Sequence, residues 1–191
     1  MRSLILYSII ALASLQSSTV LAQSTAAQRF TPWETIPERD ITNKTRIWRE
    51  IEEQSNPVLF PTGKNALLGI LKEGIKSGKI KAYDATNDRF TKEVTVDEIP
   101  LSLATRPVVK WYIKEDELQV EGKTETVVRI LGLAPVVQIA DKNGDPIDRP
   151  LLWIYYPDCR EYLASFPAST QFSWDEIFNG RHFKARVTSF K

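Results

Sequence analysis

The chain has 191 residues, with 25 basic and 24 acidic side chains and a formal net charge of +1 at pH 7. This near-equal number of basic and acidic side chains argues against nucleic acid as the main ligand and against attachment to a membrane by charge alone. It also favours association with other proteins. The length suits one domain whose core holds the fold without an internal disulfide, which a single cysteine could not form.

Residues 1–22 have the layout of a secretory signal peptide. One arginine precedes an apolar run over residues 4–15, and small residues lead to Ala22. The run is too short to span a bilayer, so we expect cleavage after Ala22 and export of the rest. Cleavage removes one arginine and no acid, which leaves 24 basic against 24 acidic residues. The only cysteine, Cys159, lies far from this site, so a membrane would be reached only through a partner.

Residues 23–40 are polar, contain two prolines and show neither a helical nor a strand period, which predicts an extended arm. The arm nevertheless carries Phe30, Trp33 and Ile36. Two interpretations follow. These side chains pack back on their own domain, or they dock on a neighbouring molecule.

Two helices are predicted next. The first is capped by Thr42 or Asn43 and reaches about Gln54, with three apolar side chains on one face: Ile47, Trp48 and Ile51. The second covers residues 65–77 and ends at Gly78, with a buried stripe made by Leu67, Leu68, Leu71 and Ile75.

The middle of the chain predicts an antiparallel meander. Strands are expected at residues 80–83, 90–94, from 106 onward with period two, at 124–131 and at 136–140. Glycine-containing turns separate them at residues 121–123 and 141–145, and Gly132 with Pro135 should bend the longest strand. Between the second and third strands, Thr95 and Glu98 form a capping-box pattern.

The stretch from 149 to 166 predicts a central strand followed by a helix. Residues 151–156 are all apolar or aromatic, so both faces of a strand there would be covered. Pro157 should end the strand, and Asp158 with Glu161 forms a capping box for a helix that carries Tyr162 and Phe166 on one face. A last capping box begins at Ser173. The fold class is therefore α+β: a small antiparallel meander with several short helices, as a single domain over residues 41–191.

Catalytic and metal-binding patterns are weak. Cys159 and His182 could form a nucleophile–base pair, and Cys159-Arg160 is similar to the Cys-Arg of L,D-transpeptidases, but the Ser-His-Gly which that family needs is absent. The alternative for Cys159 is a small buried side chain on a helix. Residues 141–145 begin like a calcium loop, yet Pro146 stands where the loop needs glycine. We expect no cofactor and no metal, which favours a structural or interaction protein.

Several blocks resemble, in the same order, the motifs of the GldN/PorN family of Bacteroidota. They are residues 46–51 with 56–61, 67–84, 113–116, 128–135, 149–160 and 172–183. The most specific block reads Arg-Pro-Leu-Leu-Trp-Ile-Tyr-Tyr-Pro-Asp-Cys-Arg, in which the family signature comprises Arg149, Pro150, Trp153, Pro157, Cys159 and Arg160. Compared with that pattern, Leu118 replaces an aromatic residue, and members are expected to continue beyond Lys191 with a longer C-terminal region.

The resemblance implies a periplasmic, non-enzymatic subunit of the type IX secretion and gliding machinery. Such a subunit forms a ring with an outer-membrane lipoprotein of the GldK/PorK type and helps couple GldL/GldM-type motor components to secretion. Aromatic and apolar side chains on mobile segments are our candidates for the partner interface: Trp33, Ile36, Phe183 and Phe190. The alternatives are a monomeric periplasmic module that binds a peptide or glycan, and a cysteine-dependent enzyme.

Overall fold

The computed structural model describes residues 30–60 and 66–189. The expected signal peptide with its cleavage site, and the interface candidate Phe190, lie outside the described residues. Within the described ranges the chain folds as an antiparallel sheet with short helices, which confirms the predicted α+β class.

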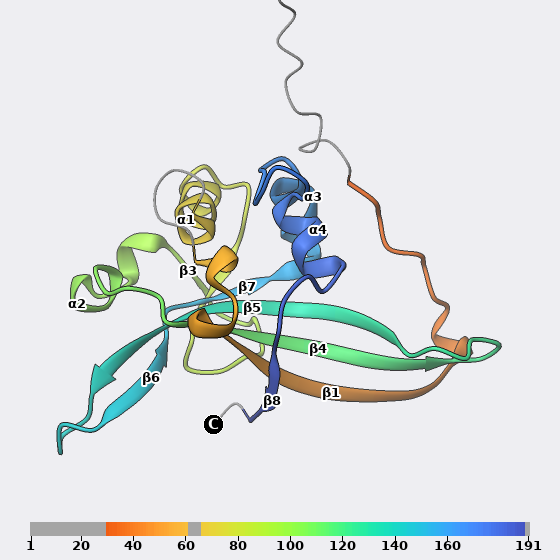
Figure 1. Ribbon diagram of the computed structural model, residues 1–191, viewed down its shortest axis with the longest axis horizontal. Coiled ribbons are helices and arrows are strands. Elements are labelled where there is room, and N and C mark those ends of the chain that lie inside the picture. Colours follow the sequence, from red (N-terminus) through yellow and green to blue (C-terminus); the bar gives the residue numbers. More distant parts are fainter. Residues whose placement is uncertain (1–29, 61–65, 190–191) are drawn as a thin grey trace, which may run out of the picture.

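An antiparallel sheet organises the structure. Its strands are β1 (Ile41–Glu52), β2 (Ala82–Tyr83), β3 (Glu93–Val94), β4 (Lys110–Val120), β5 (Val127–Ala140), β6 (Pro146–Pro150), β7 (Trp153–Tyr155) and β8 (Arg186–Thr188). They lie in the order β3-β2-β7-β5-β4-β1-β8, with β6 paired to β5. The long strands β1, β4 and β5 run on past the helices to a hairpin tip (Figure 1).

The helices lie mainly on one side of this sheet (Figure 1). They are α1 (Leu67–Lys76), α2 (Leu101–Ala104), α3 (Tyr156–Ala164) and α4 (Trp174–Asn179). Short 3-10 turns occupy Glu38–Asp40, Glu53–Ser55, Pro57–Leu59 and Val96–Glu98. The core between the two layers contains fully buried large side chains, among them Trp111, Trp174, Tyr156 and Phe178.

The helix predicted from Thr42 or Asn43 to Gln54 is wrong, because this segment is the twelve-residue strand β1. It pairs with β4 along its length and with β8 near its end. Apolar residues at 47, 48 and 51 suit a helix face, but in a strand Trp48 and Ile51 point to opposite faces. Both faces are partly covered here, and the many β-branched residues of the segment favour a strand.

The boundary between strand and helix near Pro157 also differs from the prediction. Strand β7 covers only Trp153–Tyr155, and α3 begins at Tyr156, so Pro157 lies in the first helical turn and does not end the strand. Proline suits that turn because its missing N–H would have no partner there. The expected cap by Asp158 is not formed. The central position is confirmed, since β7 lies between β2 and β5.

Other local predictions are confirmed. Helix α1 is followed by Gly78 with a φ of 71°, and capping boxes form at Thr95 and at Ser173. The turn glycines Gly122 and Gly144 have positive φ. Strand β5 continues through Gly132, where its register against β4 shifts by one residue, as a bulge would require.

A loop after β2 covers the sheet face opposite the main helices. Its residue Asp88 accepts hydrogen bonds from Trp48 Nε1 at 2.8 Å and, through the backbone carbonyl, from Lys114 Nζ at 2.6 Å. Phe90, at a φ of 55°, packs edge-on against Trp153. A Cβ at Gly132 would lie 2.7 Å from Phe90 Cζ, so only glycine allows this close approach.

Candidate arm-docking site

Among the ion pairs of the described chain, the pair between Arg160 and Asp175 is the one whose two side chains are both most enclosed. Arg160 is 3% exposed and Asp175 2%. Arg160 donates from Nε to one carboxylate oxygen and from Nη2 to the other, both at 2.9 Å. The hydroxyl of Tyr156 donates to Asp175 Oδ1 at 2.7 Å. Such two-pronged pairs combine geometric specificity with strong hydrogen bonding.

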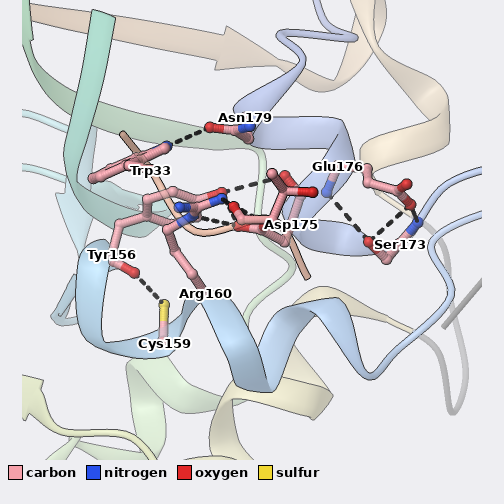
Figure 2. A network of polar contacts seen from close by, with 9 residues as sticks. Trp33, Tyr156, Cys159, Arg160, Ser173, Asp175, Glu176 and Asn179 are labelled. Carbon is pink, nitrogen blue, oxygen red and sulfur yellow. Dashed lines mark hydrogen bonds and ion pairs between the residues drawn. The ribbon is translucent and has the colours of Figure 1, made fainter. Parts of the chain in front are cut away.

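Two helix starts place these groups. Tyr156 and Arg160 are four residues apart on α3, so their side chains leave the same face. Asp175 lies in the first turn of α4, whose start is fixed by Ser173: its hydroxyl accepts from the N–H of Glu176 at 3.2 Å, and the Glu176 carboxylate accepts from the N–H of Ser173 at 2.8 Å. Figure 2 shows Tyr156 and Arg160 pointing from α3 toward Asp175, with Trp33 beside them.

The N-terminal arm is held at this ion pair. The Trp33 ring is in contact with two guanidinium groups, with its centre 4.4 Å from that of Arg160 and 4.9 Å from that of Arg129. Its Nε1 donates to Asn179 Oδ1 at 2.5 Å, and Arg160 Nη2 donates to the carbonyl of Thr31 at 2.8 Å. Phe30 also lies over Arg160, at 5.2 Å. In this structure the arm therefore packs on its own domain, which is the first of the two interpretations given above.

The next part of the arm follows strand β5 toward the hairpin tip. Glu34 pairs with Lys123 at 2.5 Å, and Arg129 donates to the carbonyl of Glu34 at 3.1 Å. The hydrogen bond and charge of Lys123 lower the pKa of Glu34. Burial lowers the pKa of Arg129, and the charge of Arg160 lowers it further. Both guanidinium groups lie within the distance at which an indole ring attracts a cation. We call Lys123, Arg129, Arg160 and Asn179 the arm-docking site.

Cys159 and His182 do not form the nucleophile–base pair that the sequence allowed. The Cys159 side chain is fully buried, its thiol donates to the carbonyl of Tyr156 at 3.3 Å, and burial raises the pKa of the thiol. His182 is exposed and stacks on Phe172, with ring centres 4.2 Å apart. Within the described ranges, no hydrogen bond or ion pair joins the two residues.

The loop that begins like a calcium site is a hairpin turn. The carboxylate of Asp141 accepts hydrogen bonds from the backbone N–H of Asn143 at 2.8 Å and of Asp145 at 2.9 Å. Among residues 30–60 and 66–189, no three His, Cys, Asp or Glu side chains gather as metal ligands would. In the same ranges, no helix is long and apolar enough to cross a membrane.

The signature residues fall in different places. Trp153 is fully buried on β7, Pro150 ends β6, and Arg149 is exposed at the sheet edge. Pro157, Cys159 and Arg160 share α3, where only Arg160 joins the arm-docking site.

The interface candidates are also dispersed. Trp33 packs against the core, Ile36 is half-buried on the arm, and Phe183 is half-buried with its ring centre 6.0 Å from that of Phe178.

Sequence reasoning missed Asp175 and Arg129. Asp175 lies inside the capping-box pattern that begins at Ser173, and the start of a helix was a sufficient explanation for it. Arg129 was one of several alternating residues of a predicted strand. The signal for Asp175 was the unexplained Arg160, since a buried arginine requires a carboxylate.

Comparison with known proteins identifies the family. The family model "Gliding motility associated protein GldN" matches residues 36–191, which is most of the chain. A search of curated protein sequences found no match to the chain. The matched range contains both helices of the arm-docking site and begins after Trp33.

Replacing Asp175 with alanine should strongly destabilise the fold, because Arg160 would remain buried without its carboxylate. We expect the free energy of unfolding, measured by urea denaturation, to fall by about 3–5 kcal/mol. The control is Lys81→Ala, which removes an ion pair with Glu93 whose side chains are 60% and 58% exposed. The control should lose less than about 1 kcal/mol, and an equally small loss for Asp175→Ala would contradict the role given to this ion pair.

The Cys159 thiol should be unreactive in the folded protein, because it is fully buried and its raised pKa keeps it protonated at neutral pH. Labelling with dithionitrobenzoate should proceed only as fast as the protein unfolds and should become immediate in denaturant. Rapid labelling of the native protein would show an accessible thiolate and would return the cysteine-enzyme hypothesis to consideration.

Proposed function

Because the chain belongs to the GldN family of gliding-motility-associated proteins, we propose that it is a non-enzymatic structural subunit of the type IX secretion and gliding machinery. Membership by itself associates the chain with gliding motility and type IX secretion. The proposed subunit works in the periplasm after signal-peptide removal. It forms a ring with an outer-membrane lipoprotein of the GldK/PorK type and helps couple GldL/GldM-type motor components to secretion.

The observation that best supports a structural role is that Cys159 is buried and that Arg160 and Asp175 are engaged in binding the arm. The candidate nucleophile Cys159 lies inside the core, whereas its candidate base His182 is exposed and stacks on Phe172. Arg160 with Asp175 holds the arm. Neither the Cys159 thiol nor the pair of Arg160 and Asp175 is open to a substrate. A buried ion pair that joins α3 to the capped start of α4 suits a rigid scaffold.

Exposed apolar side chains support assembly. Four large ones stand out on the described surface: Val58 at 58%, Leu101 at 76%, Ile147 at 42% and Val187 at 64% exposed. They belong to segments well separated in the chain: a 3-10 turn, α2, β6 and β8. Two different surfaces that fit each other give a head-to-tail contact, and such a contact closes a ring when its rotation allows. The lipid of the partner would then hold the ring at the outer membrane.

A second candidate function is a monomeric binding module for a peptide. A hollow of about 380 Å³ lies beside Arg149 and is lined partly by Val94, Ile99 and Leu103. Within the described chain, Arg149 takes part in no ion pair. Polar side chains also line this hollow, among them Asp84, Lys92 and Glu98. A guanidinium without an ion pair, beside apolar side chains, suits a peptide that carries a carboxylate. This module would be recovered as a monomer with its peptide.

Purification of the tagged protein from crosslinked host envelopes tests the assembly directly. We expect an assembly far larger than one chain that contains an outer-membrane lipoprotein, identified by mass spectrometry. Recovery of a lone monomer would contradict the ring and favour the binding module.

The same purification with Ile36→Ser tests the candidate interface. Ile36 is half-buried on an exposed part of the arm, so its loss should reduce the assembled fraction and leave the melting temperature nearly unchanged. Thr35→Ser, at the exposed neighbouring position, is the matched control and should leave both unchanged. An assembled fraction for Ile36→Ser equal to that of the control would remove Ile36 from the interface.

A further inference from the structure

We propose that the N-terminal arm is exchanged between neighbouring copies, so that in the assembled ring the arm of one copy occupies the arm-docking site of the next. This inference rests on the proposed ring. It adds the interface: the arm of one subunit on one side, and Lys123, Arg129, Arg160 and Asn179 of its neighbour on the other.

The first observation is that the arm is bound through discrete contacts and not as a strand of the sheet. Residues 30–34, the docking segment, contact the body through cation–π contacts, side-chain hydrogen bonds and one ion pair. No backbone–backbone hydrogen bond joins these residues to the described part of the sheet. The site is built on α3, α4 and the β4–β5 hairpin, so it exists whichever copy supplies the arm.

The second observation is the connector, residues 35–39, between the docking segment and β1. Four of its five residues are exposed, and Pro37 lies in the middle. Its polar contacts are local. The N–H of Asp40 donates to the carbonyl of Pro37 at 3.0 Å, the N–H of Ile41 donates to the carbonyl of Glu38, and Arg39 pairs with Asp40 at 3.5 Å. The connector therefore has the properties of a hinge: it can point the docking segment elsewhere without breaking contacts to the body.

The place where the arm joins the body makes a neighbour reachable. The body first holds the chain at Asp40, whose carbonyl accepts from the N–H of Glu121 at 2.8 Å at the hairpin tip. This tip lies beyond the helices at the end of the sheet, and from it the arm rises on the side of the sheet that carries the helices (Figure 1). An extended connector of five residues spans roughly 16–18 Å. In an exchanged arrangement, Asp40 at the hairpin tip of one subunit must therefore lie within about that distance of Lys123 and Arg129 of the next, which bind Glu34.

The energetics allow both arrangements. The contacts within one copy and between copies are identical, so exchange changes only the entropy and any new contacts at the hinge. In an isolated chain the short connector gives the arm's own site a high effective concentration, which favours the arrangement in this structure. In a ring the neighbour's site has a comparable effective concentration, and the contacts that close the ring decide between the two.

Crosslinking of two different single-cysteine chains tests this exchange. One chain carries Glu34→Cys and the other, with a distinguishable tag, carries Lys123→Cys; these ion-paired side chains are 66% and 38% exposed, so both variants should fold. The two chains are coexpressed in the host, and envelopes are treated with a bis-maleimide long enough to replace the ion pair. Cys159 stays in place because it is fully buried.

The expected result is a covalent product that contains one copy of each tagged chain. The doubly substituted chain, which can link within itself, shows that both cysteines react. A Lys142→Cys chain, substituted at the remote β5–β6 turn, replaces the Lys123→Cys chain as the collision control and should give at most a trace. Adding Trp33→Ala to the Glu34→Cys chain should reduce the product several-fold, because the docking segment loses its aromatic anchor.

Absence of the mixed product while the doubly substituted chain links internally would overturn arm exchange. The size of the complex, measured on the same material, separates this failure from failure of the proposed function. A large assembly without the mixed product keeps the ring and rejects the exchange. A mixed product confined to a dimer supports the exchange and contradicts the ring.

Discussion

The buried ion pair of Arg160 and Asp175 is the interaction on which the helical layer and the arm depend. Two charges withdrawn from water are costly unless nearly every hydrogen-bonding group finds a partner. Here the carboxylate accepts from Arg160 twice and from Tyr156, and Arg160 also donates to Thr31 of the arm. One pair therefore ties together α3, α4 and a segment more than a hundred residues earlier in the chain. A hydrophobic pair of the same size could pack the helices, but it would not fix the arm's backbone.

Charge pairs also fix the register of the long strands. Glu115 on β4 is fully buried and pairs with Arg49 on β1 and with Arg181 after α4, at 2.7 Å for the latter. One step along the same strands, Asp116 pairs with Arg46 and Lys44. Burial would raise the pKa of Asp116, but the hydrogen bonds from Arg46 and Lys44 outweigh it and lower the pKa. A slip by one residue would bring each carboxylate to the wrong face, so these pairs specify one alignment.

Part of this architecture could be read from the sequence. Turn glycines, the capping boxes at Thr95 and Ser173, the apolar stripe of α1 and the central position of β7 follow from local chemistry, and the structure has them. The capping box predicted at Asp158 is not formed. Strand β1 could not be recognised locally, because its apolar spacing fits a helix and only pairing with β4 and β8 decides the matter. The arm-docking site was out of reach for a related reason. It joins Lys123, Arg129, Arg160 and Asn179 from the β4–β5 hairpin, α3 and α4, and no local pattern in the sequence links these residues to one another or to the arm.

The arm is held in place by its coupling to the buried ion pair. A double-mutant cycle measures the free energy of this coupling. Free energies of unfolding are compared for the wild type, Trp33→Ala, Arg160→Met and the double variant. Since the Trp33 ring lies 4.4 Å from the Arg160 guanidinium, the double variant should lose less stability than the two single losses added together. The predicted coupling is about 0.5–3 kcal/mol, the range found for residues in contact. Strict additivity would show that the arm and the buried pair are independent, and it would contradict the docking site described above.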